Sequence, residues 1–178
     1  WAYLIKRTLM RPRDIINFIS ECLKAAEGKS EISKSDFLKA EHAYSQLRLK
    51  TLIFEWKNTY SGIEALLMLL AGQNEYFKVS EHATSKLLDN LYEKMGLQKE
   101  TRLDDIYIKI QKSVEGDQAH LEPFEICQQV FSRLHLVGAV SLKLSPNSAW
   151  QFFHENSQSI TEHQIKLETG VKINPMLH

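Results

Sequence analysis

Two arginines flank a proline near the start of the sequence, and this group has the clearest potential for chemistry. Arg11, Pro12, Arg13 and Asp14 follow one another. Arginine is always charged, and its planar guanidinium group donates bidentate hydrogen bonds to phosphate. Arg11 and Arg13 are therefore candidates for contact with nucleotide phosphates. A structural interpretation is also open, because Asp14 in the first turn of a helix beginning near Pro12 interacts favourably with the helix dipole.

Residues for catalysis or metal binding do not occur at the spacing that such sites need. The seven histidines form no HExxH motif and no pair four residues apart. Gly28-Lys29-Ser30 matches only the end of a phosphate-binding P-loop, because Leu23 stands where the pattern needs glycine. Cys127 lies on the apolar side of a predicted helix, which favours a buried structural thiol over a nucleophile. We therefore expect neither enzyme activity nor a cofactor.

The hydrophobic pattern predicts a mainly α-helical chain with some β structure, an α+β fold. Ser33 to Asp36 resembles a capping box with aspartate in place of glutamate. In the first of the predicted helices, apolar residues follow the spacing of an amphipathic helix: Ile15, Ile16, Ile19, Leu23 and Ala26. Apolar residues at helical spacing predict helices over residues 13–26, 34–58, 63–70, 80–95 and 122–135.

Short alternating segments predict strands in the second part of the chain. Residues 76–79 form one candidate strand, and residues 137–144 and 150–153 are expected to pair as a β-hairpin around a turn at 145–148. From residue 62 onward the element order is that of a winged helix-turn-helix domain. We expect a helical segment at 1–60 and a winged-helix domain at 61–178, with an insertion at about 97–121.

In a winged helix-turn-helix domain the second helix of the pair enters the major groove of DNA, and here that helix is the one predicted at 122–135. Its polar side chains and those of the wing are candidate contacts for nucleic acid or a protein partner: Gln128, Gln129, Ser132, Arg133, Lys143 and Asn147. Residues 122–154 contain only two lysines or arginines, whereas DNA binding depends on several such contacts to phosphates. The pattern therefore gives weak support to strong DNA binding.

The formal net charge of +0 is the sum of two opposite parts. Residues 1–60 carry 11 Lys/Arg and 7 Asp/Glu, whereas residues 61–178 carry 11 Lys/Arg and 15 Asp/Glu. The positive charge is therefore concentrated in the first segment and not in the predicted DNA-binding domain.

The composition also indicates the cellular location of the protein. Its longest apolar run, Ala65–Ala71, is far shorter than the ~20 residues that cross a bilayer. Cys22 and Cys127 form no CxxC pair, which indicates free thiols in a reducing compartment. We expect a cytoplasmic protein without a membrane partner.

Residues 3–19 (YLIKRTLMRPRDIINFI) resemble the lid-helix region of bacterial P-loop ATPases of the signalling AAA/STAND type. The stretches 43–45, 54–56, 137–138 and 172–178 are similar to the C-terminal winged-helix region of that family. The resemblance implies that Arg11 or Arg13 senses the nucleotide phosphates in an intact ATPase. Both Walker motifs are absent from this sequence, which begins at Trp1 and reads as a piece of a longer protein.

These observations lead to two hypotheses. In the first, the chain is a non-catalytic regulatory module, the winged-helix tail of a larger ATPase, which relays nucleotide state or docks a partner; the partner is the missing ATPase core or another protein. In the second, it is a winged-helix transcription regulator that binds double-stranded DNA as a homodimer.

Overall fold

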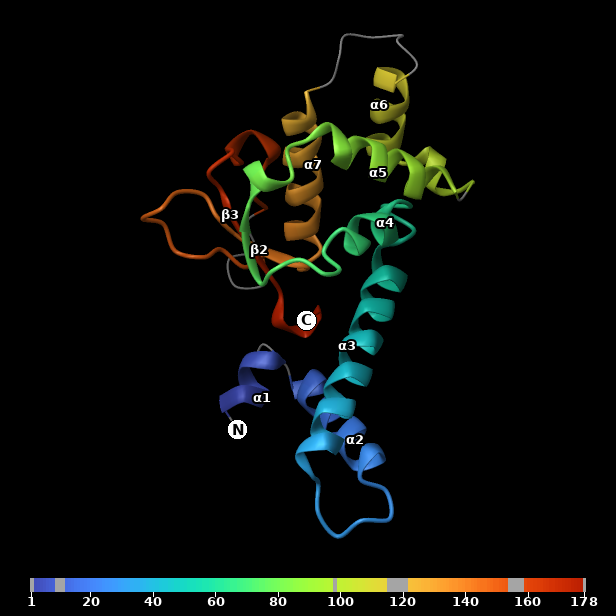
Figure 1. The fold of residues 1–178 in the computed structure, drawn as a ribbon, viewed down its shortest axis with the longest axis vertical. Helices are drawn as coiled ribbons and strands as arrows, with labels where there is room; N and C mark the ends of the chain where they lie inside the picture. The colour runs from blue at the N-terminus through green and yellow to red at the C-terminus, as the bar shows by residue number, and fades with distance from the viewer. Residues whose placement is uncertain (1, 9–11, 98, 115–121, 154–158, 178) are drawn as a thin grey trace. The chain divides into compact units, whose positions relative to one another are not determined.

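The computed structural model describes residues 2–8, 12–97, 99–114, 122–153 and 159–177 (Figure 1). It is 61% helix and 8% strand with a small antiparallel sheet, which confirms the expected mainly helical α+β class. The chain forms two compact units. The first contains Trp1–Leu52 and Asn174–His178, and the second contains Ile53–Ile173. Compared with the expected division at residue 60, residues 53–60 belong to the second unit and the C-terminal residues to the first.

None of the helices in the described parts of the chain has the length and apolar character needed to cross a membrane.

The first unit is built from helices around a small apolar core. Its elements are α1 (Ala2–Arg7), α2 (Pro12–Ala25), α3 (Lys34–Trp56) as far as Leu52, and the short 3₁₀ turn η4 (Pro175–Leu177). Pro12 occupies the first position of α2, where its missing N–H costs no helical hydrogen bond. After α2 the chain turns at Gly28, whose φ of +78° is a conformation that favours glycine. The core consists of Phe18, Cys22, Ala40, Tyr44 and Met176.

The predicted capping box at the start of α3 is present. The backbone N–H of Asp36 donates to Ser33 Oγ at 3.2 Å, and the backbone N–H of Ser33 donates to Asp36 Oδ2 at 3.1 Å. Lys29 Nζ lies 2.6 Å from Asp36 Oδ1. The hydrogen bonds from Lys29 and Ser33 lower the pKa of Asp36 to about 2.

We expect Asp36 to make the start of α3 sensitive to acid. Because its folded-state pKa lies below the unfolded value, the stabilisation is present above about pH 4 and is lost as the pH falls through about 2. Carboxyl NMR titration should give a pKa of about 2 for Asp36, and Ser33→Ala should raise it. An ordinary pKa near 4 for Asp36, unchanged in Ser33→Ala, would contradict the cap.

The second unit combines helices with a three-stranded antiparallel sheet of order β1-β3-β2 (Figure 1). Phe77 on β1 pairs with Val171 on β3, which pairs with Leu142 on β2, and all three side chains are buried on the core face. The elements are α4 (Ile63–Met68), β1 (Tyr76–Lys78), η1 (Val79–Glu81), α5 (Ser85–Gly96), η2 (Thr101–Leu103), α6 (Asp105–Val114), α7 (Pro123–Leu136), β2 (Val140–Lys143), η3 (Glu162–Gln164) and β3 (Gly170–Ile173).

The expected hairpin of residues 137–144 with 150–153 is confirmed only in part. The strand partner of β2 is β3, and the segment 150–153 contributes one isolated bridge, between Gln151 and Leu142. Val171 and Ile173 point into the core while Gly170 and Lys172 point away from it, so β3 has the alternation that a sheet with one buried face requires. Trp150 instead packs against the sheet, with its Cη2 atom 3.3 Å from where a Cβ of Gly170 would lie.

Two further expectations in the second unit need correction. The helix expected from Ser80 begins at Ser85, because residues 79–81 form the 3₁₀ turn η1. Within the expected insertion at 97–121, the described part contains η2 and α6, and α6 buries Ile106, Tyr107 and Ile110. These apolar side chains pack into the unit, so α6 is part of its core; residues 98 and 115–121 of the expected insertion lie outside the described residues.

Candidate functional site

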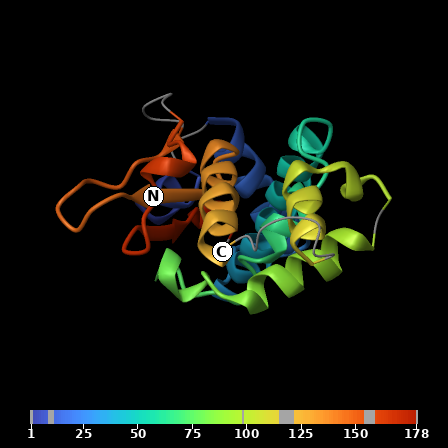
Figure 2. The same ribbon diagram turned by 90° about the horizontal axis from the view of Figure 1, so that it is seen from above.

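The predicted recognition helix, α7, is the central helix of the second unit. It contacts α4, α5, α6, β2 and η3, and Figure 2 shows it between the strands and α6. Its buried residues occur on several sides of the helix: Ile126, Cys127, Val130, Phe131, Arg133, Leu134 and His135. A helix that is covered in this way has little free surface for a DNA groove.

Two polar side chains of α7 bind the chain segment that precedes β3. Gln128 Nε2 donates to the backbone oxygen of Ile165 at 2.7 Å, and Ser132 Oγ donates to the backbone oxygen of Ile160 at 2.7 Å. Ile160 and Ile165 are themselves buried. Both candidate contact residues therefore hold a neighbouring segment against α7.

On another side of the helix, Gln129 Oε1 accepts a hydrogen bond from Lys109 Nζ on α6 at 2.8 Å. This bond gives the third polar residue of α7 an internal partner as well. The role of Gln128, Gln129 and Ser132 as contacts for nucleic acid or a partner stays a prediction.

Arg133 lies in a buried ionic cluster. Its side chain is 9% exposed, with Nη1 2.8 Å from Asp104 Oδ1 and Nη2 2.6 Å from Asp105 Oδ1. The guanidinium carbon lies 4.4 Å from the centre of the Tyr60 ring. The arginine therefore joins α7 to the turn before α6 and to the residues that precede α4.

Asp104 is the centre of this cluster, because it also accepts the backbone N–H of Gly62 at 2.9 Å and of Ile106 at 3.0 Å. Burial works against the charge of both Arg133 and Asp105. The neighbouring opposite charges outweigh it, so the pKa of Arg133 is raised and that of Asp105 is lowered. Arg133 and Asp105 are therefore both charged at neutral pH.

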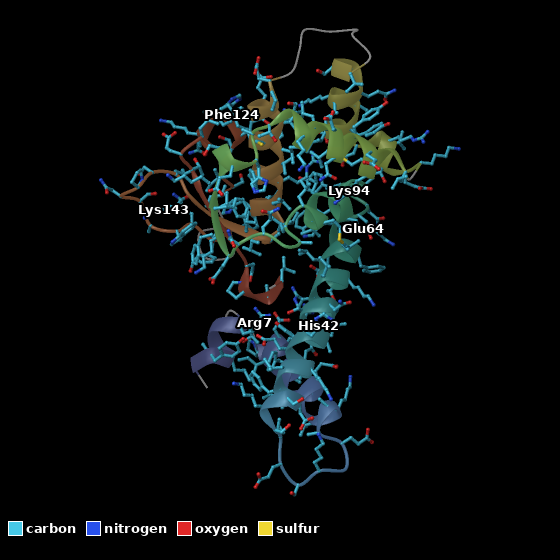
Figure 3. The ribbon with its side chains drawn as sticks, in the orientation of Figure 1. Arg7, His42, Glu64, Lys94, Phe124 and Lys143 are labelled. Carbon is cyan, nitrogen blue, oxygen red and sulfur yellow. The ribbon has the colours of Figure 1, made fainter. Side chains whose placement is uncertain are left out.

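The two candidate residues of the wing lie outside the core. Lys143 ends β2 and is half-buried (Figure 3). Asn147 is exposed in the turn where Ser148 Oγ bonds the backbone of Ser145. These positions remain accessible, in contrast to Arg133.

The Arg-Pro-Arg-Asp group separates into different environments. Arg13 is exposed in the first turn of α2, and Arg11 lies outside the described residues. Asp14 is buried, with Arg48 Nη1 of α3 3.5 Å from its Oδ1. Asp14 therefore has a role in packing α2 against α3, while Arg13 is available to a ligand.

Arg7, another basic residue near the start of the chain, forms a second ion pair in the first unit. Arg7 Nε lies 3.1 Å from Glu41, and Arg7 Nη2 donates to Ser45 Oγ at 2.9 Å. Arg7 is buried (Figure 3). Part of the positive charge of residues 1–60 is therefore internal.

In the described parts of the chain, no group of three or more His, Cys, Asp or Glu residues could hold a metal ion. Cys22 and Cys127 are free thiols and both are buried, as expected. Burial raises the pKa of the Cys127 thiol to about 12, which keeps it protonated at neutral pH.

The apolar pattern predicted for residues 13–26 is only partly buried, because Ala26 is buried and Ile15 is half-buried but Ile16 and Leu23 are not. The helix buries Asp14, Phe18 and Cys22, whereas Ile16 is 63% exposed and Leu23 is 61% exposed. Ile19 lies between them on the same face and is half-buried. We refer to Ile16, Ile19 and Leu23 as the α2 stripe. Their exposure depends on the packing of α2 against α3 and is not encoded in the local apolar pattern.

Comparison with protein families gives a match for the first part of the chain. A family model described as FunZ-associated C-terminal helical domain matches residues 1–53. The match ends within one residue of Leu52, where the first unit ends in α3. No curated protein and no solved structure matches the chain.

Proposed function

We propose that the chain is a non-catalytic regulatory module whose first unit docks onto another protein through the α2 stripe. The observation that carries the proposal is the exposure of Ile16 and Leu23 on one face of a regular helix. Large apolar side chains grouped at the surface are typical of protein-binding sites. An amphipathic helix with anchors at this spacing binds in an apolar groove of its partner.

The surroundings of the α2 stripe fit such an interface. Arg13 and Lys24 are exposed on the same helix, so a charged rim borders the apolar centre, as in most protein interfaces. Arg13 is exposed, and in an intact ATPase of the resembled type it would contact a nucleotide phosphate. Docking through α2 would then couple partner binding to the nucleotide state.

The family match supports the proposal that the first unit is a module. The matched family is described as a helical domain that is C-terminal and associated with FunZ, and its extent coincides with the first stretch of a compact unit. The buried free thiols suit a reducing compartment, so we place the module in the cytoplasm.

The alternative function, a dimeric winged-helix regulator of double-stranded DNA, has less support. The polar groups of α7 that would read bases have partners within the second unit: Gln128, Gln129, Ser132 and Arg133. This alternative predicts duplex binding that weakens steeply with salt.

Photo-crosslinking in cells tests the proposed function. A photoreactive amino acid at Leu23 should give an adduct with one other protein, which mass spectrometry identifies. The same group at Lys112, exposed on α6, is the control and should not give that adduct. Absence of any adduct at Leu23 would contradict the proposal, and adducts only between copies of the chain would replace it with a homodimer.

A further inference from the structure

The outer face of the three-stranded sheet combines lysines with aromatic side chains. Strand register places Tyr76 beside Lys172 in one cross-strand row, and Lys78, Gly170 and Lys143 in the next row. These residues alternate with Phe77, Val171 and Leu142, which are buried on the core face. Tyr76, Lys78, Lys143 and Lys172 therefore belong to the face directed away from the core.

The aromatic part of this face is held in place by several contacts. Gly170 carries no side chain, so Trp150 can lie against the central strand, 3.3 Å from where a Cβ would be. The rings of Trp150 and Tyr76 have centroids 5.8 Å apart. Lys172 Nζ lies 4.9 Å from the centre of the Tyr76 ring and 3.7 Å from Glu75 Oε1. Tyr76 nevertheless remains 49% exposed.

The charges of the face lie on its two outer strands, on either side of Gly170. Lys78 on one outer strand is exposed, and Lys143 on the other is half-buried. They occupy the same row, two strand spacings or about 10 Å apart. Lys172 is largely covered and partly neutralised by Glu75, so among the described residues of this face Lys78 and Lys143 are the cations that a ligand can reach.

We propose that this face, formed by Tyr76, Lys78, Lys143 and Trp150, binds single-stranded nucleic acid. A base can stack on an exposed aromatic ring whatever its sequence, while lysines contact the neighbouring phosphates. In a duplex the faces of the bases are covered by their neighbours, so the aromatic side chains would contribute nothing. An acidic peptide would use the lysines but would not need the rings. The proposal rests on the second unit alone and does not depend on docking through α2.

Fluorescence anisotropy of the full chain with fluorescein-labelled dT12 tests the proposal. Two phosphate contacts predict a slope of about −1.4 in log K against log salt, hence binding about sevenfold weaker at 200 mM than at 50 mM salt. Tyr76→Leu should weaken binding by about 5- to 150-fold, and Tyr76→Phe, which keeps the ring, should restore it. The partial exposure of Tyr76 makes both variants compatible with folding.

Charge variants separate the sheet face from the overall charge. Lys78→Glu with Lys143→Glu should abolish most of the binding, whereas the same change at Lys99 and Lys112, both exposed, should have a small effect. The proposal is overturned if dT12 does not bind at 50 mM salt or if both pairs of substitutions act equally. Tighter binding of a 12-base-pair duplex would overturn it in favour of duplex DNA, and equal binding of polyglutamate with no effect of Tyr76→Leu would indicate an acidic-peptide site.

Discussion

Replacing Arg133 with methionine should lower the free energy of unfolding by about 3–5 kcal/mol, the cost of leaving a buried charge without its partner. Asp104, whose side chain is 1% exposed, would lose the guanidinium that lies 2.8 Å away. The Tyr60 ring would lose its cationic contact as well. Urea unfolding followed by circular dichroism measures the change.

Two matched variants decide whether the cluster is responsible. Lys143→Met also replaces a cation with methionine, but at a more accessible position, and should cost less than about 0.5 kcal/mol. Asp105 is 62% exposed, so Asp105→Asn should cost no more than about 1 kcal/mol. If Arg133→Met were as mild as Lys143→Met, the ionic cluster would not be important for stability, and Arg133 would be free to act as an external contact.

Phe18→Ala should destabilise the first unit by about 3–5 kcal/mol, because it removes a ring from the centre of a small core. Phe18 is fully buried, and the centroid of its ring lies 5.2 Å from those of both Phe37 and Tyr44. Hydrogen exchange should show loss of protection in α2 and in the first part of α3. Protection of α7 and β3 should be retained, since these elements belong to the other unit.

Ile16→Ala is the control on the same helix. Its side chain is 63% exposed, so the substitution should change the free energy of unfolding by less than about 0.5 kcal/mol. Equal losses for Phe18→Ala and Ile16→Ala would mean that α2 packs through a different face from the one described.

Local patterns predicted the elements well where the relevant interactions are close in sequence. Pro12 begins α2, Ser33 and Asp36 cap α3, and the short strand near Tyr76 is present. These features depend on residues within about one helical turn or one strand, so the local sequence is enough to predict them. The mainly helical class with a small sheet follows from the same local signals.

Long-range partners could not be predicted in the same way. The strand that pairs with β2 begins at Gly170, far beyond the nearby segment that the hairpin pattern favoured. Asp14 is buried on α2 because Arg48 meets it from α3, and nothing near Asp14 in the sequence indicates that pair. With Asp14 and Phe18 inside, the helix turns Ile16 and Leu23 outward.

The same limit applies to the polar residues of the predicted recognition helix. Gln128 and Ser132 look like surface residues from their spacing, but they bond the backbone oxygens of Ile165 and Ile160. Every residue has a backbone carbonyl oxygen, so residue types do not indicate which of them accepts a distant hydrogen bond. The candidate surfaces that the structure favours, the α2 stripe and the outer face of the sheet, depend on such distant packing.

A crosslinking scan along α2 in cells tests the central claim most directly, that this helix docks the module onto a protein. The photoreactive group is placed in turn at each residue from Ile16 to Lys24 except the core residues Phe18 and Cys22, and the yield of the partner adduct is measured. The account predicts maxima at Ile16, Ile19 and Leu23 and minima at Asn17 and Glu21, because the α2 stripe faces the partner. A yield that does not follow the helical period, or that peaks at Glu21, would contradict it.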